Sequence, residues 1–233
     1  MMAIKTNQKI EIMNTNQTTK TSHLPPGWAF EFHGHQCPFM PLGYRMAKLA
    51  MARLGVEHEP DHGFYVFPEL GEAHPQTCLM DGIQVATGAT YGKLTIAKTF
   101  YGKLAATFYH PKKGAVRSSI RPDFVDALGK FEFFVYRKKG IEPSQIPLPV
   151  RQEIIQWTYA QPDEAIFKVE DKPDFTFTPL KGSFNKTKCG MCGEYVFERY
   201  VRMKDGQPLC IPCSGYEAKP VTKAVVPQSN LIA

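Results

Sequence analysis

The stretch Phe32-His33-Gly34-His35-Gln36-Cys37-Pro38 places three metal-binding side chains at every second position. In an extended segment, residues i, i+2 and i+4 point to one face, so His33, His35 and Cys37 would converge on a single point. A helix is disfavoured here because the residue before a proline is pushed to the β region. A thiolate beside two imidazoles is typical of either a metal site or a reactive cysteine.

A helix is expected directly after this stretch. Pro38 suits its first position, apolar residues recur at helical spacing as far as Leu54, and Gly55 is a suitable stop. Arg45 on this helix is expected to lie mostly outside the core. Cys37 would then sit at a helix N-terminus, where the partial positive charge favours the thiolate and lowers the pKa of the thiol.

The second lone cysteine, Cys78, opens another predicted helix. Thr77 could cap this helix and Gly88 could close it. Asp81 lies on the same face as Cys78, one turn along the helix. The following stretch, 87–93, resembles a phosphate-binding loop only loosely, and a plain turn is the favoured interpretation.

The rest of the first 180 residues alternates strand-like and helix-like segments without a strict βαβ rhythm. Such an order favours an α+β fold with a mixed β-sheet flanked by helices. Strands are expected within 64–70, 94–100, 103–110, 115–120 and 165–170, and helices within 121–140 and 150–160. A proline-rich stretch at 171–182 has the composition of a linker.

Length and composition indicate a globular protein with one medium domain and one small domain. The chain has 233 residues, 43% hydrophobic and 21% charged, and it contains no apolar run long enough to span a membrane. The first 26 residues are polar and lack the apolar core of a secretion signal, so we expect a disordered leader and a cytoplasmic protein. The expected divisions are a leader (1–26), a core domain (27–180), a zinc finger (181–217) and a tail (218–233).

The C-terminal region carries the spacing of a zinc site with four cysteine ligands. Cys189 and Cys192 form one C-x2-C pair, and Cys210 and Cys213 form a second pair after 17 intervening residues. Four thiolates complete a tetrahedral shell and leave no open position for water, so a structural zinc ion is expected. The segment between the pairs predicts a β-hairpin with Asp205-Gly206 at its turn.

Charge alone does not indicate a nucleic-acid partner. The net charge is +6, and residues 181–233 contain 8 Lys or Arg against 4 Asp or Glu, a difference that a zinc ion bound by four thiolates would halve. The finger also carries an aromatic and basic set that could stack bases, although packing of its aromatic residues into a small core is the favoured interpretation. The set comprises Tyr195, Phe197, Arg199, Tyr200, Arg202 and Lys204.

On these residues the chain resembles the FmdE family, named for one component of formylmethanofuran dehydrogenase, in its two-domain form. The resemblance rests on FHGHQCP with the following LGYR, on CLMDGIQVATGATYGK and on YGKLAATF, and it extends over about residues 28–216. It implies an α+β core, a treble-clef-like zinc finger and a metal-binding active site built around the HGH-C segment. The sequence departs from the family at Ala89, where a cysteine is usual.

Three hypotheses for function follow. In the first, the chain is an accessory or subunit-like protein of molybdenum or tungsten formylmethanofuran dehydrogenase systems, independent of any membrane and able to form a homodimer. His35, Cys37 and Cys78 would bind zinc or another transition metal, with His33 as a fourth ligand or a supporting group, and Asp81 would be the nearest proton acceptor.

The second hypothesis is thiol chemistry without metal. Cys37 would be the nucleophile with a neighbouring histidine as its base, and Cys78 would resolve an intermediate as a disulfide. The third is a nucleic-acid or protein-binding module based on the finger. Whether the chain is an enzyme does not follow from the sequence.

Overall fold

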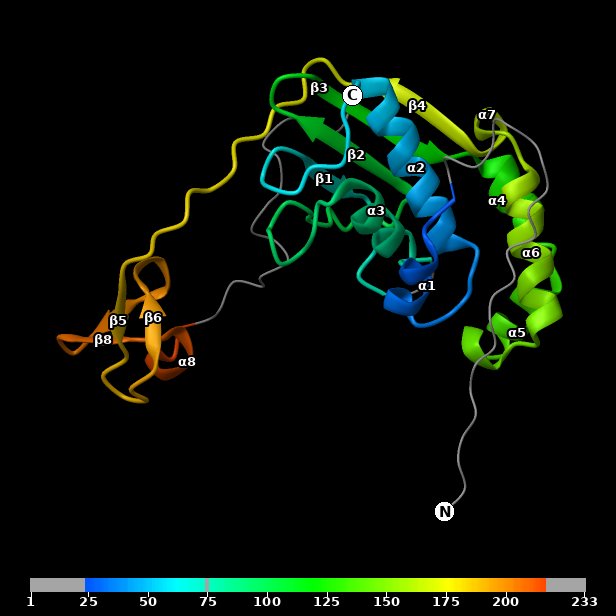
Figure 1. Cartoon of the computed structure of the whole chain (residues 1–233). Coiled ribbons are helices and arrows are strands. Elements are labelled where there is room, and N and C mark those ends of the chain that lie inside the picture. Colours follow the sequence, from blue (N-terminus) through cyan, green and yellow to red (C-terminus); the bar gives the residue numbers. More distant parts are fainter. Residues whose placement is uncertain (1–23, 74–75, 217–233) are drawn as a thin grey trace.

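The fold is seen in a computed structural model that describes residues 24–73 and 76–216 (Figure 1). The expected tail and all but the last three residues of the expected leader lie outside these residues. The core contains α1 (Gly27–His33), α2 (Phe39–Leu54), β1 (Tyr65–Pro68), α3 (Leu79–Thr87), β2 (Ala105–His110), β3 (Gly114–Ile120), α4 (Pro122–Leu128), α5 (Glu132–Lys138), α6 (Leu148–Ala160), α7 (Asp163–Ile166) and β4 (Phe167–Asp171).

The central sheet has the strand order β1-β2-β3-β4, and each neighbouring pair is antiparallel. Its parallel component is a short segment beside β1, where Val66 forms a parallel bridge with Ile96. The Val66 N–H donates to Thr95, and the Ala97 N–H donates back to Val66. The α+β class with a mixed sheet is therefore confirmed, although the strand expected at 94–100 is reduced to this bridge.

One face of the sheet is covered by α2 and α3 (Figure 1). The apolar side of α2 and the inward side chains of the strands form one large buried cluster, to which Met46, Phe108 and Val116 belong. The stop signals act as expected, since Gly55 and Gly88 adopt the left-handed conformation at the ends of α2 and α3.

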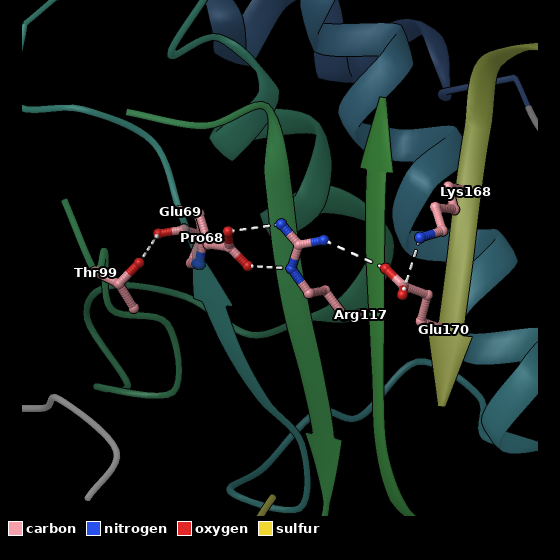
Figure 2. Close-up of polar contacts among 6 residues, drawn as sticks. All are labelled: Pro68, Glu69, Thr99, Arg117, Lys168 and Glu170. Carbon is pink, nitrogen blue, oxygen red and sulfur yellow. Dashed lines mark hydrogen bonds and ion pairs between the residues drawn. The ribbon is translucent and has the colours of Figure 1, made fainter. Parts of the chain in front are cut away.

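The other face of the sheet carries aromatic packing and a row of charges. Phe175 and Phe177, from the predicted linker, pack on Phe67, so this part of the linker belongs to the core. Beside them the nearly buried Glu69 accepts two hydrogen bonds from Arg117, at 2.6 and 2.8 Å. Figure 2 shows that this row runs on across the sheet, through ion pairs from Arg117 to Glu170 (3.5 Å) and from Glu170 to Lys168 (3.1 Å). Such pairing satisfies a carboxylate that would be costly to bury alone.

Two expectations for the helices are wrong. The single helix expected at 121–140 is two helices, α4 and α5, separated at Gly129 because the chain leaves helical geometry before Glu132. Arg45 is 6% exposed rather than outside. Its guanidinium donates to the Thr158 and Gln161 carbonyls at the end of α6, which links α2 to that helix.

The finger contains β5 (Lys186–Lys188), β6 (Tyr195–Phe197), β7 (Arg202–Lys204), β8 (Gln207–Leu209) and α8 (Ile211–Ser214). Asp205 and Gly206 form the β7–β8 turn with positive φ angles of 50° and 74°, as expected, but β6 pairs with β5. Its small core includes Val196, whereas Tyr195 and Phe197 are 62% and 49% exposed. The inward packing expected for these aromatic residues is therefore wrong.

Candidate metal centre

The HGH-C segment converges by a tight turn and not by the extended conformation that its spacing predicted. His33 is the last residue of α1, and Gly34 follows with a φ angle of 86°, which a residue with a side chain rarely adopts. The turn brings the His33 and His35 rings to 4.2 Å between centroids. The convergence of these residues is therefore confirmed, but through a helix end.

The two lone cysteines are brought together by a close crossing of α2 and α3. Cys37 lies one residue before the N-cap of α2, and Cys78 is the N-cap of α3. A Cβ atom at Gly43 would lie 2.0 Å from the Leu79 carbonyl oxygen, and one at Gly82 would lie 1.9 Å from that of Met40. The helix backbones therefore touch at two glycines, and this contact sets the distance between their cysteine-bearing ends.

Four ligand atoms form the resulting cluster. The atoms offered by His33, His35, Cys37 and Cys78 all lie within 4.8 Å of one another. His33 Nε2 is 3.5 Å from Cys37 Sγ, and His35 Nε2 is 3.9 Å from Cys78 Sγ. Zinc bonds of about 2.3 Å to sulfur and 2.0 Å to nitrogen, at tetrahedral angles, separate the two ligand atoms by about 3.6 Å. The donor set and its spacing thus fit a tetrahedral ion such as zinc.

Asp81 holds one of these ligands in position. Its Oδ2 accepts a hydrogen bond from His33 Nδ1 at 2.7 Å, which leaves Nε2 of the same ring facing Cys37. Gln84 donates to the other carboxylate oxygen at 3.3 Å and accepts from the Tyr91 N–H at 3.1 Å. A carboxylate behind a histidine ligand fixes its tautomer and ring orientation. Asp81 therefore acts on His33, and its expected service as a proton acceptor stays a prediction.

The proton distribution among the thiols differs from the expectation. A hydrogen bond with Cys78 and burial raise the pKa of the Cys37 thiol well above its ordinary value, whereas the pKa of Cys78 is lowered, chiefly by the hydrogen bond from Cys37. The expected low pKa of Cys37 is therefore wrong in the metal-free protein. Burial lowers the pKa of His33, but hydrogen bonds with Asp81 and Cys78 outweigh it and raise the value to about 9.

A pocket of about 340 Å³ opens beside the cluster. Three of the four ligands reach it, whereas His33 lies behind them and its side chain is 4% exposed. Sequence reasoning missed the opposite wall, because its residues lie about 100 positions away and carry no motif of their own. The lining consists of His35, Cys37, Cys78, Phe39, Gln76, Phe133, Phe134, Arg137, Lys138 and Pro143.

The turn at 87–93 does not bind phosphate through its lysine. Lys93 Nζ donates to the carbonyls of Glu59 and Pro60, at 3.4 and 2.9 Å, so its ammonium is used within the fold. Ala89, at the position where the resemblance implies a cysteine, is 2% exposed and belongs to the apolar core. It offers no ligand to the cluster.

The finger brings its four cysteine sulfurs together in a second cluster within 4.8 Å. Cys192 and Cys210 are 4.0 Å apart at sulfur, and the Cys210 N–H donates to Cys189 Sγ at 3.3 Å. Backbone N–H groups, those of Cys192 and Cys210 foremost, lower the pKa of Cys189 to about 6. These donors stabilise thiolates, the form that binds a metal ion. The cluster at the four predicted cysteines is consistent with a zinc finger.

Residues 32–168 match a family model described as FmdE, Molybdenum formylmethanofuran dehydrogenase operon. The match covers more than half of the chain and includes the whole core cluster. The chain belongs to the FmdE family. This confirms the resemblance that the HGH-C and C-x2-D-G-I-Q motifs carried.

Two similar proteins extend the comparison. A probable S-adenosyl-L-methionine-binding protein of Archaeoglobus fulgidus is 34% identical over 213 residues, which are 85% of this chain and 54% of that protein. The chain thus spans about half the length of this relative. The crystal structure of an FmdE-like protein of the tungsten formylmethanofuran dehydrogenase type, from Syntrophus aciditrophicus, aligns with a TM-score of 0.51. At 22% identity, over 80% of this chain and 88% of that one, it supports the fold.

Proposed function

We propose that this FmdE protein binds an exchangeable transition-metal ion, zinc in the first place, in its core domain and a structural zinc ion in its finger. The observation that carries the proposal is the core cluster, in which two imidazoles and two thiols lie within 4.8 Å of one another, with Asp81 supporting one imidazole. Mixed nitrogen and sulfur ligation suits zinc, and copper, nickel and iron also accept such donors.

The pocket favours exchange at the core ion over a closed structural site. Cys37, Cys78 and His35 line the pocket, so one side of a bound ion would face a cavity large enough for a small molecule. In the finger, four sulfurs would enclose the ion. We therefore assign ligand binding or exchange to the core site and a folding role to the finger.

The test is the metal content of the full-length protein. Wild-type protein purified with zinc should carry two ions per chain, and Cys78→Ser and Cys210→Ser should each carry one. Thr77→Ser, next to Cys78, serves as the matched control and should keep both ions. A chelator should remove the core ion first. Purified Cys78→Ser protein with two ions would refute the core assignment and would favour metal-free thiol chemistry at Cys37.

We further propose an accessory or subunit-like role in molybdenum or tungsten formylmethanofuran dehydrogenase-type systems, in the cytoplasm. Support comes from the description of the family and from the six free cysteines, which suit a reducing compartment. No helix within the described residues is long and apolar enough to cross a bilayer. Size-exclusion chromatography of the zinc-loaded chain with a purified dehydrogenase complex should show co-elution, and separate elution would count against the role. The same column, run on the chain alone, tests the homodimer.

The name of the Archaeoglobus protein concerns S-adenosylmethionine, and we do not extend that ligand to this chain. The chain spans about half of that protein, so the named property can reside in the other half. S-adenosylmethionine also carries a net positive charge, whereas Arg137 and Lys138 line the pocket and no carboxylate does among the described residues. Cations of equal sign repel in a confined site.

A further inference from the structure

The core pocket has a polarity that selects for ligand charge. Around Cys37 and Cys78 its wall is apolar and aromatic, formed by Phe39, Phe133 and Phe134. On the side of α5 the wall is basic. The described lining residues include two cations and no Asp or Glu.

The charge of Arg137 is only partly used inside the protein. Its Nη1 donates to the Ile141 carbonyl at 2.6 Å and contacts Glu142 Oε2 at 3.2 Å. The Glu142 carboxylate is 67% exposed, so water screens this pair. Lys138, the next residue, is exposed at the rim and adds a second positive charge.

We propose, on the basis of the metal-binding function above, that this pocket binds a small anion with an apolar or aromatic body. The carboxylate or phosphate of the ligand would lie against Arg137 and Lys138. Its apolar body would lie among Phe39, Phe133 and Phe134, with the far end facing the ion on Cys37 and Cys78. Charge-assisted hydrogen bonds are the strongest available to such a ligand, and aromatic walls supply most of the buried contact area.

Adjacent lysines on α5 give a matched pair of variants. Lys138 lines the pocket, whereas its exposed neighbour Lys139, the C-cap of α5, does not. Lys138→Gln and Lys139→Gln remove the same charge from neighbouring positions, and both side chains are exposed, so neither should disturb folding. Arg137→Gln is a poorer choice because Arg137 also binds the Ile141 carbonyl.

The experiment is a titration of zinc-loaded, full-length protein, followed by NMR through the ring signals of His35. Three probes of similar shape are compared, namely 3-phenylpropanoate, 2-phenylethyl phosphate and the neutral 3-phenylpropanamide. Both anions should bind at least about tenfold more tightly than the amide, a factor of ten being about 1.4 kcal/mol. Their relative affinities separate carboxylate from phosphate recognition. Lys138→Gln should reduce this preference severalfold, and Lys139→Gln should leave it unchanged.

The outcomes separate the two proposals. Equal binding of acid and amide, equal effects of the two lysine variants, or no binding of either anion to protein with two zinc ions would overturn the anion site and leave the metal site standing. A core that takes up no zinc would overturn the proposed function and the anion site with it. S-adenosylmethionine, added as a fourth probe, should bind more weakly than the anions, and tighter binding would contradict the charge selection.

Discussion

The two clusters of four ligands are assembled by opposite means. In the finger, the ligands lie on two short knuckles between Cys189 and Cys213, and the only buried apolar support within the described finger is a small cluster that includes Val196 and Leu209. In the core, the ligands come from the end of α1 and the starts of α2 and α3, on a large apolar cluster. The finger therefore depends on its ion for folding, whereas the core fold places the ligands before an ion arrives.

The sharpest test of this comparison is Cys210→Ser. Loss of one thiolate should remove the finger zinc, and residues 186–214 should unfold, because zinc binding supplies on the order of 10 kcal/mol to such modules. The core should remain folded. Limited proteolysis and NMR measure both regions in one sample. Cys78→Ser is the comparison variant, and it should lose its ion while both domains stay folded. A protease-resistant finger in Cys210→Ser would end the distinction.

A second variant attacks the helix crossing. In Gly82→Ala the new Cβ atom would meet the Met40 carbonyl at 1.9 Å, so α2 and α3 must move apart. We expect the free energy of unfolding to fall by about 3 kcal/mol or more, and the core ion to bind more weakly. Gly92→Ala is the control, since a Cβ atom there meets nothing within 4 Å. Thermal unfolding and zinc content measure the effect, and an unchanged core site would show that the crossing does not set the cysteine distance.

The sequence could predict the members of each cluster but not how the core cluster is built. The finger followed from local spacing, since its ligands are close along the chain. His33, His35 and Cys37 also lay in one motif, yet their extended conformation was wrong because Gly34 ends a helix there. Pairing with Cys78 depends on the contact at Gly82, between helices about 40 residues apart. The basic wall at Lys138 is more distant still, and no local pattern marks it.

A third variant sharpens the comparison within the core. Asp81→Asn keeps the size of the side chain but weakens its hold on His33 Nδ1, a hydrogen bond of 2.7 Å. Loss of such a supporting carboxylate reduces metal affinity by about 10- to 100-fold. Competition with a chromogenic chelator should show that loss for the core ion and none for the finger ion. Asp126→Asn, at an exposed position of α4, should change neither affinity.

The last and smallest effect concerns which core thiol reacts in the metal-free protein. Position before α2 favoured Cys37, but Cys37 is 2% exposed and its pKa is raised, whereas Cys78 is half-buried and its pKa is lowered. The thiolate is the nucleophile, so iodoacetamide near pH 7 should modify Cys78 before Cys37. Mass spectrometry after brief labelling gives the order. Zinc should protect both thiols, because binding an ion engages both sulfurs. Labelling of Cys37 first would mean that the α2 N-terminus outweighs burial, and labelling that zinc does not slow would remove both cysteines from the metal site.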